Sequence, residues 1–317
     1  MKNLIVVTGS AGFVGANLIK HLLKNTQNLI IGFDDFTLGN KKLVNLNKSR
    51  RYKFYNLDIN NYNKVKKIIN KYNYEKYNCF FYHLASNSDV KKSEDLKIDT
   101  EKTLLTTISA SRLFLELGFN HFIFTSSPVV FGEVSKPINY NTKMNPISNY
   151  GFAKYFSEIY IKKNIISKNV SRWLFRFPNV VGPHLTHGIL YDFNNKIKKN
   201  NKYLEVLGDG NQQKPYLYVS DIVKAISLPT TKKFLNFKGF QELNLSPLDN
   251  GIKVRDIVEL FVKYKKLKIK IKYSGGKRGW KGDVPKYSYD FKKNKHSLWM
   301  PRFNSKNSII KSIKDLK

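Results

Sequence analysis

The chain has 317 residues, and its 56 lysines and arginines against 23 aspartates and glutamates give a formal net charge of +33. This length is enough for a large domain with a smaller one, and the absence of an apolar run of about 18 residues argues against a membrane-spanning helix. The lysines are spread over the whole chain and no nucleic-acid-binding module is recognisable, so we expect no nucleic acid and no membrane as partner, although a positive field attracts anionic substrates.

The first predicted element is an apolar strand at residues 4–7, followed by a glycine-containing turn and a helix at residues 16–23. Gly9 permits the tight turn, Gly12 lets the backbone approach a pyrophosphate, and Gly15 lets the helix pack closely on the strand. The N–H groups and the dipole of the helix N-terminus would face these phosphates. The turn therefore indicates a dinucleotide site, with the spacing G-x-x-G-x-x-G in place of the commoner G-x-G-x-x-G.

A second apolar run at residues 29–33 ends in Asp34. This is the distance from the glycine turn at which a carboxylate meets the ribose hydroxyls of an adenosine. A structural turn followed by a surface acid would look similar. However, strand, glycines and acid stand in the order that a nucleotide-binding half-domain requires.

The chain then alternates strands with helices. Helices are expected at residues 65–72, 96–117 and 150–160, and strands at residues 52–55, 79–82, 121–124 and 173–177. This alternation predicts an α/β protein with a doubly wound parallel (Rossmann) sheet, whose ligands lie outside the carboxyl ends of the strands. The short polar segments after Asp34, Ala85 and Ser127 are therefore candidate walls of a site.

Beyond Pro178 the pattern becomes less regular. We expect residues 1–178 to form the dinucleotide-binding Rossmann domain, completed by part of residues 216–250. Residues 179–317 would mainly form a smaller C-terminal α/β domain that binds the substrate.

Tyr150 and Lys154 are the strongest candidates for chemistry. They stand at positions i and i+4 of a predicted helix, so they share one face. A cation at this distance favours the phenolate and lowers the pKa of a tyrosine, which makes it a usable base. An ordinary helix surface would carry the same pair. Ser126 and Ser127, at the end of the preceding strand, favour the catalytic interpretation because they could donate a hydrogen bond.

Together these motifs resemble the extended short-chain dehydrogenase/reductases and, among them, the NAD-dependent epimerase/dehydratase family. They are most similar to the nucleoside-diphosphate-sugar epimerases of the UDP-glucose 4-epimerase type. The resemblance spans nearly the whole chain in the expected order. It rests on Thr8-Gly9-x-x-Gly12-x-x-Gly15, Asp34, His83-Leu84-Ala85, Ser126-Ser127, Tyr150-x-x-x-Lys154, Arg176-Phe177-x-Asn179, Gly208-Asp209-Gly210-x-Gln212, Tyr218-Val219-x-Asp221 and Gly279-Trp280-Lys281-Gly282-Asp283-Val284-Pro285.

The resemblance implies epimerisation of a nucleoside-diphosphate sugar, in first place at C4 of a UDP-hexose through a transient 4-keto sugar, with NAD as a cofactor that is regenerated in each cycle. Tyr150 would take the proton of the sugar hydroxyl. Lys154 would hold the nicotinamide ribose and lower the pKa of the tyrosine, and Ser127 would hydrogen-bond the reacting oxygen.

The resemblance also implies the residues that bind the two ligands. The NAD contacts would come from Gly9, Gly12, Phe13, Val14, Gly15, Asp34, Asp35, Asn40, Asp58, Ile59, Leu84, Ala85, Ser86, Tyr150, Lys154 and Phe177. The sugar-nucleotide contacts would come from Ser86, Ser127, Tyr150, Asn179, Lys214, Arg278 and Tyr287. In this family a bulky residue such as Tyr287 narrows the sugar pocket, although a packed aromatic residue would look the same.

The chain departs from the family pattern at several places. Pro128-Val129 stands where dehydratases carry an Asp-Glu pair and decarboxylases a Glu, so elimination and decarboxylation lose their acid or base. Thr103 and Thr106 replace the Asn and Gly of N-x-x-G-T. Lys214 stands in place of an arginine, and Arg278 or Lys281 would replace the arginine that binds the diphosphate near the C-terminus.

Alternatives remain open at this point. Another NAD(P)-dependent sugar-nucleotide enzyme (a dehydratase, reductase or uronate epimerase) would share most of these motifs, and a non-catalytic NAD-binding regulator would share the fold.

The helices at residues 96–117 and 150–160 could pair with those of a second copy in a homodimer. The single cysteine, Cys79, and the lack of a signal-like N-terminus favour the cytoplasm. His184 and His187 lack the carboxylate spacing of a metal site, so no metal is expected.

Overall fold

A computed structural model describes residues 2–88, 95–200, 202–280, 282–294 and 298–316. Its contacts divide the chain into two units. The first comprises residues 1–126, 153–176 and 223–243, and the second residues 127–152, 177–222 and 244–317.

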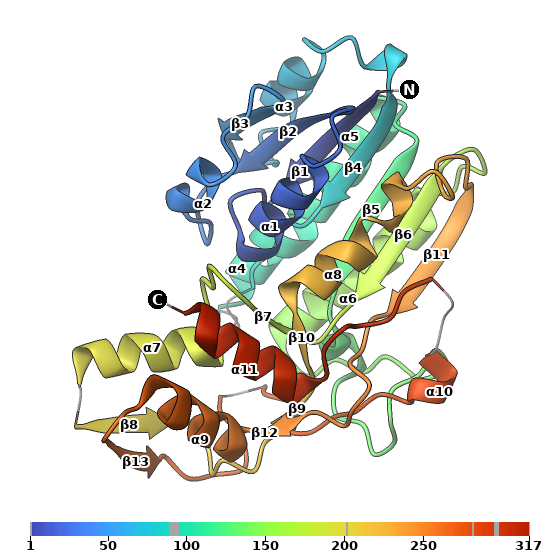
Figure 1. Ribbon diagram of the computed structural model, residues 1–317. Helices are drawn as coiled ribbons and strands as arrows, with labels where there is room; N and C mark the ends of the chain where they lie inside the picture. The colour runs from blue at the N-terminus through green and yellow to red at the C-terminus, as the bar shows by residue number, and fades with distance from the viewer. Residues whose placement is uncertain (1, 89–94, 201, 281, 295–297, 317) are drawn as a thin grey trace. The chain divides into compact units, whose positions relative to one another are not determined.

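The first unit is built on a seven-stranded sheet with the order β11-β6-β5-β4-β1-β2-β3 (Figure 1). Strands β1 to β6 pair with one another in parallel. The strands are β1 (Asn3–Thr8), β2 (Asn28–Asp34), β3 (Tyr52–Asn56), β4 (Asn78–His83), β5 (His121–Ser126), β6 (Ser171–Arg176) and β11 (Gly239–Asn244). This sheet confirms the α/β class and the doubly wound topology predicted from the sequence.

The strand order reverses between β1 and β4. Thr8, the last residue of β1, pairs with Phe33 of β2 on one side and with His83 of β4 on the other. The segments that follow β1 and β4 therefore leave the sheet side by side. In open α/β sheets this is the place where ligands bind.

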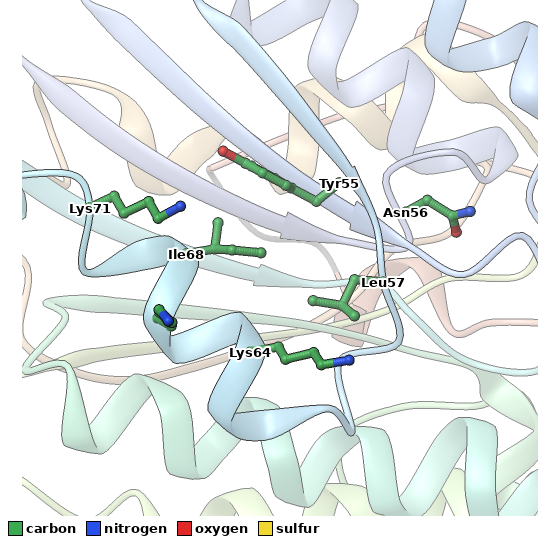
Figure 2. A pocket seen from close by; sticks show the side chains of 7 residues that line it. Tyr55, Asn56, Leu57, Lys64, Ile68 and Lys71 are labelled. Carbon is green, nitrogen blue, oxygen red and sulfur yellow. The ribbon is translucent and has the colours of Figure 1, made fainter.

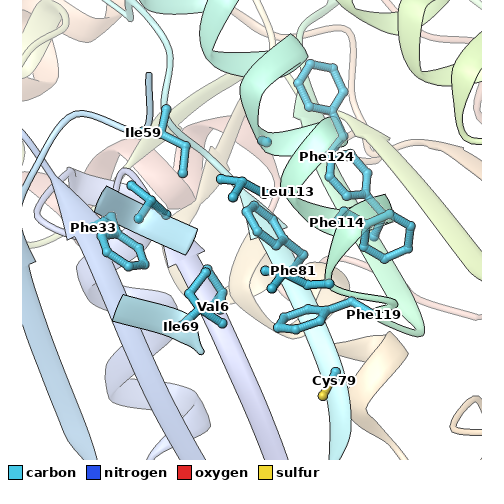
Figure 3. Packing of buried hydrophobic residues seen from close by; sticks show 14 of the residues in the cluster. Val6, Phe33, Ile59, Ile69, Cys79, Phe81, Leu113, Phe114, Phe119 and Phe124 are labelled. Atoms are coloured by element: carbon cyan, nitrogen blue, oxygen red, sulfur yellow. The ribbon is translucent and has the colours of Figure 1, made fainter. Parts of the chain in front are cut away.

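Helices cover the sheet, with α1 (Phe13–Leu22) in front of it in the view of Figure 1 and α5 (Thr106–Glu116) behind. The helix α3 (Tyr62–Ile69), α5 and α6 (Asn149–Asn164) contribute to one buried apolar cluster, which Figure 3 shows as a stack of aromatic and aliphatic side chains. Within the cluster the ring of Phe122 lies 5.9 Å from that of Phe81 and 5.1 Å from that of Phe114. The shorter elements of this part of the chain are α2 (Lys41–Asn45), η1 (Tyr74–Lys76), α8 (Val219–Ile226) and η5 (Leu228–Thr230).

The long helix predicted at residues 96–117 is interrupted in the structure. It consists of α4 (Leu96–Asp99), a π-helical turn η3 (Thr100–Leu105) and α5. The hydroxyls of Thr106 and Thr107 both donate to the carbonyl oxygen of Thr103, at 3.0 and 2.7 Å. Side-chain bonds of this kind compete with the regular helical pattern, which explains the wider turn.

His83, the last residue of β4, is fully buried in the sheet. Its Nδ1 lies 2.8 Å from the hydroxyl of Thr8 and its Nε2 lies 3.1 Å from that of Thr107. Burial, reinforced by the charge of Lys154, lowers the pKa of His83 to about 3. The side chain is therefore a neutral structural link between two hydroxyls, as its place in an apolar strand requires.

We expect acidification to destabilise the protein through His83. Its pKa is about 3 in the folded state against about 6.5 in an unfolded chain, so below the latter value the unfolded state binds the additional proton. Between pH 7 and pH 5 this histidine should remove about 2 kcal/mol from the free energy of unfolding. Urea titrations at both pH values measure the loss. It should shrink in His83→Gln and persist in His184→Asn, a control at an exposed histidine with a left-handed backbone. Equal losses in both variants would contradict the assignment.

Among its described residues, the second unit has three two-stranded sheets. They pair β7 (Asn179–Val181) with β10 (Tyr216–Tyr218), β9 (Gln213–Lys214) with β12 (Ile252–Lys253), and β8 (Tyr203–Val206) with β13 (Lys270–Tyr273). Its helices are η4 (Pro128–Phe131), α7 (Ile189–Lys199), α9 (Val254–Lys265), α10 (Phe291–Asn294) and α11 (Ser305–Asp315). A separate apolar core joins α7, α9 and α11, and within it Phe193 of α7 packs edge-on against Phe261 of α9 at 5.5 Å.

Candidate active site

The glycine turn after β1 is as tight as the sequence predicts. Gly9 has a φ of 69°, and a Cβ atom there would lie 2.8 Å from the backbone nitrogen of Ala85. A Cβ atom on Gly15 would lie 2.2 Å from the carbonyl oxygen of Gly9, so only glycine lets α1 pass this close to the turn. A Cβ atom on Gly12 would meet that oxygen alone, at 3.2 Å. Gly9 and Gly15 therefore serve packing, while the surface beside Gly12 is open.

The N-terminus of α1 lies at this open surface. Gly12 is its N-cap residue, and within the described part of the chain no side chain caps the helix; its first turn carries no acidic residue. Phe13 and Val14 are the first helical residues, so both would contribute backbone N–H groups to a ligand at this surface. The side chain of Phe13 is buried and would not take part. Free N–H groups, the positive end of the helix dipole and a cradle that a Cβ atom would fill fit a dinucleotide pyrophosphate.

Asp34 is fixed against the same turn. Its Oδ2 accepts a hydrogen bond from the backbone N–H of Ala11 and its Oδ1 accepts one from that of Phe36, both at 2.9 Å. Burial raises the pKa of Asp34, and these two N–H groups oppose the rise. Each oxygen has a further lone pair for a ribose hydroxyl, so the position fits the predicted role.

Asp35 and Asp58 are held by a residue that sequence reasoning missed. Lys102, in the π-helical turn η3, donates from Nζ to Oδ2 of both carboxylates at 2.6 Å. Burial alone would raise the pKa of Asp35, but the hydrogen bonds from Lys102 and Thr37 and the charge of Lys102 together hold this pKa below its usual value. No sequence signal marks Lys102 among the many lysines of the chain.

The side chains of two other predicted NAD residues have structural roles. The side chain of Asn40 caps α2 by accepting from the backbone N–H of Lys42 at 2.9 Å. The side chain of Ile59 belongs to the apolar cluster of Figure 3. Contacts from Ile59 to a nucleotide would therefore come from its backbone.

The segment after β4 lies beside the glycine turn. The backbone N–H of Leu84 donates to the carbonyl oxygen of Thr8 at 3.3 Å, and that of Ala85 donates to the Thr8 hydroxyl at 3.2 Å. Ser86 follows and is half-buried. These three residues thus follow β4 at the switch point of the sheet, and their contact with NAD stays a prediction.

Lys154 is buried on α6, one turn after Tyr150. Its Nζ donates to the carbonyl oxygen of Thr125 at 2.8 Å and lies 4.8 Å from the centre of the Phe124 ring. Burial lowers the pKa of Lys154 to about 7, against the opposing charges of Glu158 and Asp99. The amine is therefore held at the carboxyl end of β5.

Ser127 and Tyr150 belong to the second unit. Ser127 precedes the short helix η4, and its Oγ accepts from the backbone N–H of Val129 at 3.5 Å. Tyr150 is the second residue of α6 and is half-buried. Pro128, which follows Ser127, is buried in η4. Neither Pro128 nor Val129 carries a carboxylate, so an acid or base for an elimination is missing at these two positions.

A buried ion network anchors the strand end that leads to Ser127. Ser126 donates from Oγ to Oε1 of Glu158 at 2.5 Å. Arg176 donates to both oxygens of Glu158, at 2.8 and 2.5 Å, and contacts Glu242 at 2.5 Å. Arg176 and Glu158 are each 1% exposed. The network therefore joins β5, α6, β6 and β11 at the strand end that precedes Ser127.

The two cations predicted to bind a diphosphate have protein partners. Lys214 forms an ion pair with Asp283, which is 2% exposed. Arg278 donates from Nη1 to the carbonyl oxygen of Asp283 at 2.6 Å, and its Nη2 lies 2.7 Å from Glu133. Both cations are thereby held at one buried residue of the second unit, Lys214 at the carboxylate of Asp283 and Arg278 at its backbone carbonyl oxygen.

The remaining substrate candidates are distributed over the second unit. The side-chain amide of Asn179 donates to the carbonyl oxygen of Pro215 at 3.4 Å. Tyr287 packs edge-on against Tyr289 at 6.1 Å, and burial raises its pKa. Phe177, which was predicted as an NAD contact, also lies in this unit, just before β7, and is half-buried. Lys281, the alternative to Arg278, lies outside the described residues.

A groove of about 290 Å³ lies apart from these residues, between β3 and α3 (Figure 2). Its lining consists of Tyr55, Asn56, Leu57, Lys64, Lys67, Ile68 and Lys71.

No group of three or more His, Cys, Asp or Glu side chains within the described ranges is arranged to hold a metal ion. No helix in that part of the chain is long and apolar enough to cross a membrane.

Comparison with known proteins places these features in a family context. Residues 5–236 match the model of the NAD dependent epimerase/dehydratase family. The chain is 28% identical to a putative UDP-glucose 4-epimerase of Methanocaldococcus jannaschii over 99% of this chain and 98% of the relative. It is 26% identical to a UDP-glucuronate 4-epimerase of Thermodesulfobacterium geofontis, over 97% and 94% of the two chains. A crystal structure of a UDP-galactose 4-epimerase superposes with a TM-score of 0.81 at 27% identity and 98% coverage of both chains.

Proposed function

The chain belongs to the NAD dependent epimerase/dehydratase family, and from this premise we propose that it inverts C4 of a UDP-hexose with NAD as its cofactor. The observation that carries the proposal is the placement of α6. This helix bears Tyr150 and, one turn later, Lys154, whose amine is fixed on the carbonyl oxygen of Thr125 at the end of β5. The relatives named above, which are UDP-sugar 4-epimerases, support the same substrate class.

The two units would bind different ligands. We propose that the first unit binds NAD, with the pyrophosphate at Gly12 and α1 and the ribose at Asp34. The second unit would bind the sugar nucleotide through Asn179 and the cations Lys214 and Arg278. Lys214 supplies a charge for the diphosphate without the bidentate geometry of an arginine.

The reaction needs a base, a hydrogen-bond donor and a hydride acceptor. The bound dinucleotide would supply the acceptor for the hydrogen of C4. Tyr150 would take the proton of the 4-hydroxyl while Ser127 holds the same oxygen, so that the sugar becomes a 4-ketone. Once the ketone presents its other face, Tyr150 would return the proton to the same oxygen. The sum of these steps is an isomerisation that consumes no cofactor.

The same residues argue against the related reactions. A dehydratase must remove a second proton beside the ketone, and Pro128 and Val129 supply no acid or base for this step. Among 4-epimerases, a UDP-uronate remains the second candidate substrate, because one of the relatives acts on UDP-glucuronate by its name. Proton NMR of the enzyme with a panel of UDP-, GDP- and dTDP-sugars separates these possibilities. Conversion of a UDP-hexose to its C4 epimer supports the proposal, while release of a keto sugar or turnover of another nucleotide alone would overturn it.

We also propose that the protein is a cytoplasmic homodimer that pairs through α6. Phe152, Phe156 and Ile159 stand at positions i, i+4 and i+7 of this helix and are 44%, 50% and 36% exposed. Three apolar side chains on one stripe favour a partner surface. Light scattering should give twice the chain mass of 36.9 kDa, and Phe156→Lys should shift the mass towards the monomer. A monomeric wild type would contradict the proposal.

A further inference from the structure

Lys102 joins two loops that are far apart in the sequence. Asp35 follows β2 and Asp58 follows β3, and the amine of Lys102 lies 2.6 Å from a carboxylate oxygen of each. The three side chains are 25%, 27% and 22% exposed, so the contacts are partly shielded from solvent. Ion pairs of this geometry, with two charge-assisted hydrogen bonds on one ammonium, are stronger than exposed surface pairs.

The lysine lies in the π-helical turn η3. Glu101, Lys102 and Thr103 lie within η3, where the helix widens. Thr103 Oγ1 accepts from the backbone N–H of Asn87 at 3.0 Å, which ties the turn to the segment after β4. The turn therefore connects the ends of three strands, and π-helical turns often occur at functional sites.

The charges around Lys102 explain why the connection matters. Asp34 neighbours Asp35, whose charge adds to the effect of burial in raising the pKa of Asp34. The pKa of Asp35 itself is held below its usual value by hydrogen bonds from Lys102 and Thr37. Without Lys102, the carboxylates of Asp35 and Asp58 would face each other at the end of the sheet where the adenosine half of a dinucleotide is expected. Like charges at this distance repel and would push the two loops apart.

We infer that Lys102 is a positioning residue of the cofactor site, which clamps the loops after β2 and β3 in the arrangement that accepts the adenosine half of NAD. The inference rests on the proposed NAD binding, but not on the identity of the sugar. It assigns to Lys102 an effect on the affinity for adenosine diphosphate ribose, the adenosine-containing half of the cofactor, in the absence of any substrate.

Calorimetry with adenosine diphosphate ribose on the NAD-free protein tests the clamp. Lys102→Met keeps the length of the side chain and removes the charge, and we expect its dissociation constant to rise about tenfold or more. Lys97→Met is the matched control, because Lys97 is 74% exposed and its amine lies 3.9 Å from Glu101. This control should bind like the wild type. Equal affinities of Lys102→Met and wild type would overturn the inference, whereas a wild type that does not bind the probe would contradict the NAD assignment itself.

Two rescue variants separate positioning from a general loss of structure. Lys102→Arg retains the charge and should restore most of the affinity. In Asp35→Asn/Lys102→Met one of the facing charges is absent, so this double variant should bind the probe more tightly than Lys102→Met alone. If neither variant recovers affinity although both melt at the wild-type temperature, the clamp is contradicted.

Discussion

Replacement of Tyr150 by phenylalanine should lower turnover by about 10²–10⁴-fold, the usual contribution of a positioned acid or base. The variant lacks only the hydroxyl that would exchange a proton with the sugar, while Lys154 and the glycine turn are unchanged. Purified Tyr150→Phe should therefore contain as much NAD as the wild type. Turnover is measured by the NMR assay described above, and bound NAD by extraction and absorbance.

Tyr160→Phe is the matched control for this prediction. Tyr160 lies on the same helix α6, more than two turns after Tyr150, and like Tyr150 it is half-buried. Its substitution should leave turnover within about twofold, as expected for a residue that takes no part in proton transfer. Turnover near the wild-type value in Tyr150→Phe would contradict the assigned base. Loss of NAD in that variant would indicate a role in cofactor binding in addition.

Replacement of Arg176 by methionine should lower the free energy of unfolding by about 3–5 kcal/mol, because it leaves the buried charge of Glu158 without its main partner. Arg176 and Glu158 are each 1% exposed and share two hydrogen bonds. Urea unfolding followed by circular dichroism measures the loss.

Arg172 provides the control for this prediction on the same strand. It stands four residues before Arg176 on β6, is half-buried, and donates to the carbonyl oxygen of Ile165. Arg172→Met should cost clearly less than Arg176→Met. Arg176→Met/Glu158→Leu replaces both partners by apolar side chains and should recover much of the stability, since it leaves no unpaired charge on Glu158. Equal losses in Arg172→Met and Arg176→Met would contradict the role of the buried pair.

The parts of the fold that sequence reasoning predicted are those with local signals. Strand β1, the glycine turn and α1 follow from an apolar run and three glycines, and the structure shows steric reasons for Gly9 and Gly15. The parallel sheet follows from alternating strands and helices. The interruption of the helix at residues 96–117 was not predicted. It goes with the hydrogen bonds that the hydroxyls of Thr106 and Thr107 donate to the carbonyl oxygen of Thr103, and the sequence does not specify these bonds.

The contacts that were missed are long-range. Lys102 is 67 residues from Asp35 and 44 from Asp58 in the chain, so no spacing rule connects them. The same holds for Arg176 and Glu242, whose pairing requires that β6 and β11 be neighbours in the sheet. Such contacts form only after the tertiary structure has brought the strand ends together, and they decide how the predicted carboxylates are charged and held.

The most direct test of the central claim follows the hydrogen at C4. UDP-galactose carrying deuterium at C4 is incubated in ordinary water with the purified enzyme and no added cofactor, and the products are analysed by NMR. The account predicts a mixture of UDP-galactose and UDP-glucose in which both sugars retain the deuterium at C4, because the same hydride leaves and returns. Loss of the deuterium to solvent, accumulation of a keto sugar, or no conversion of any UDP-hexose would contradict it.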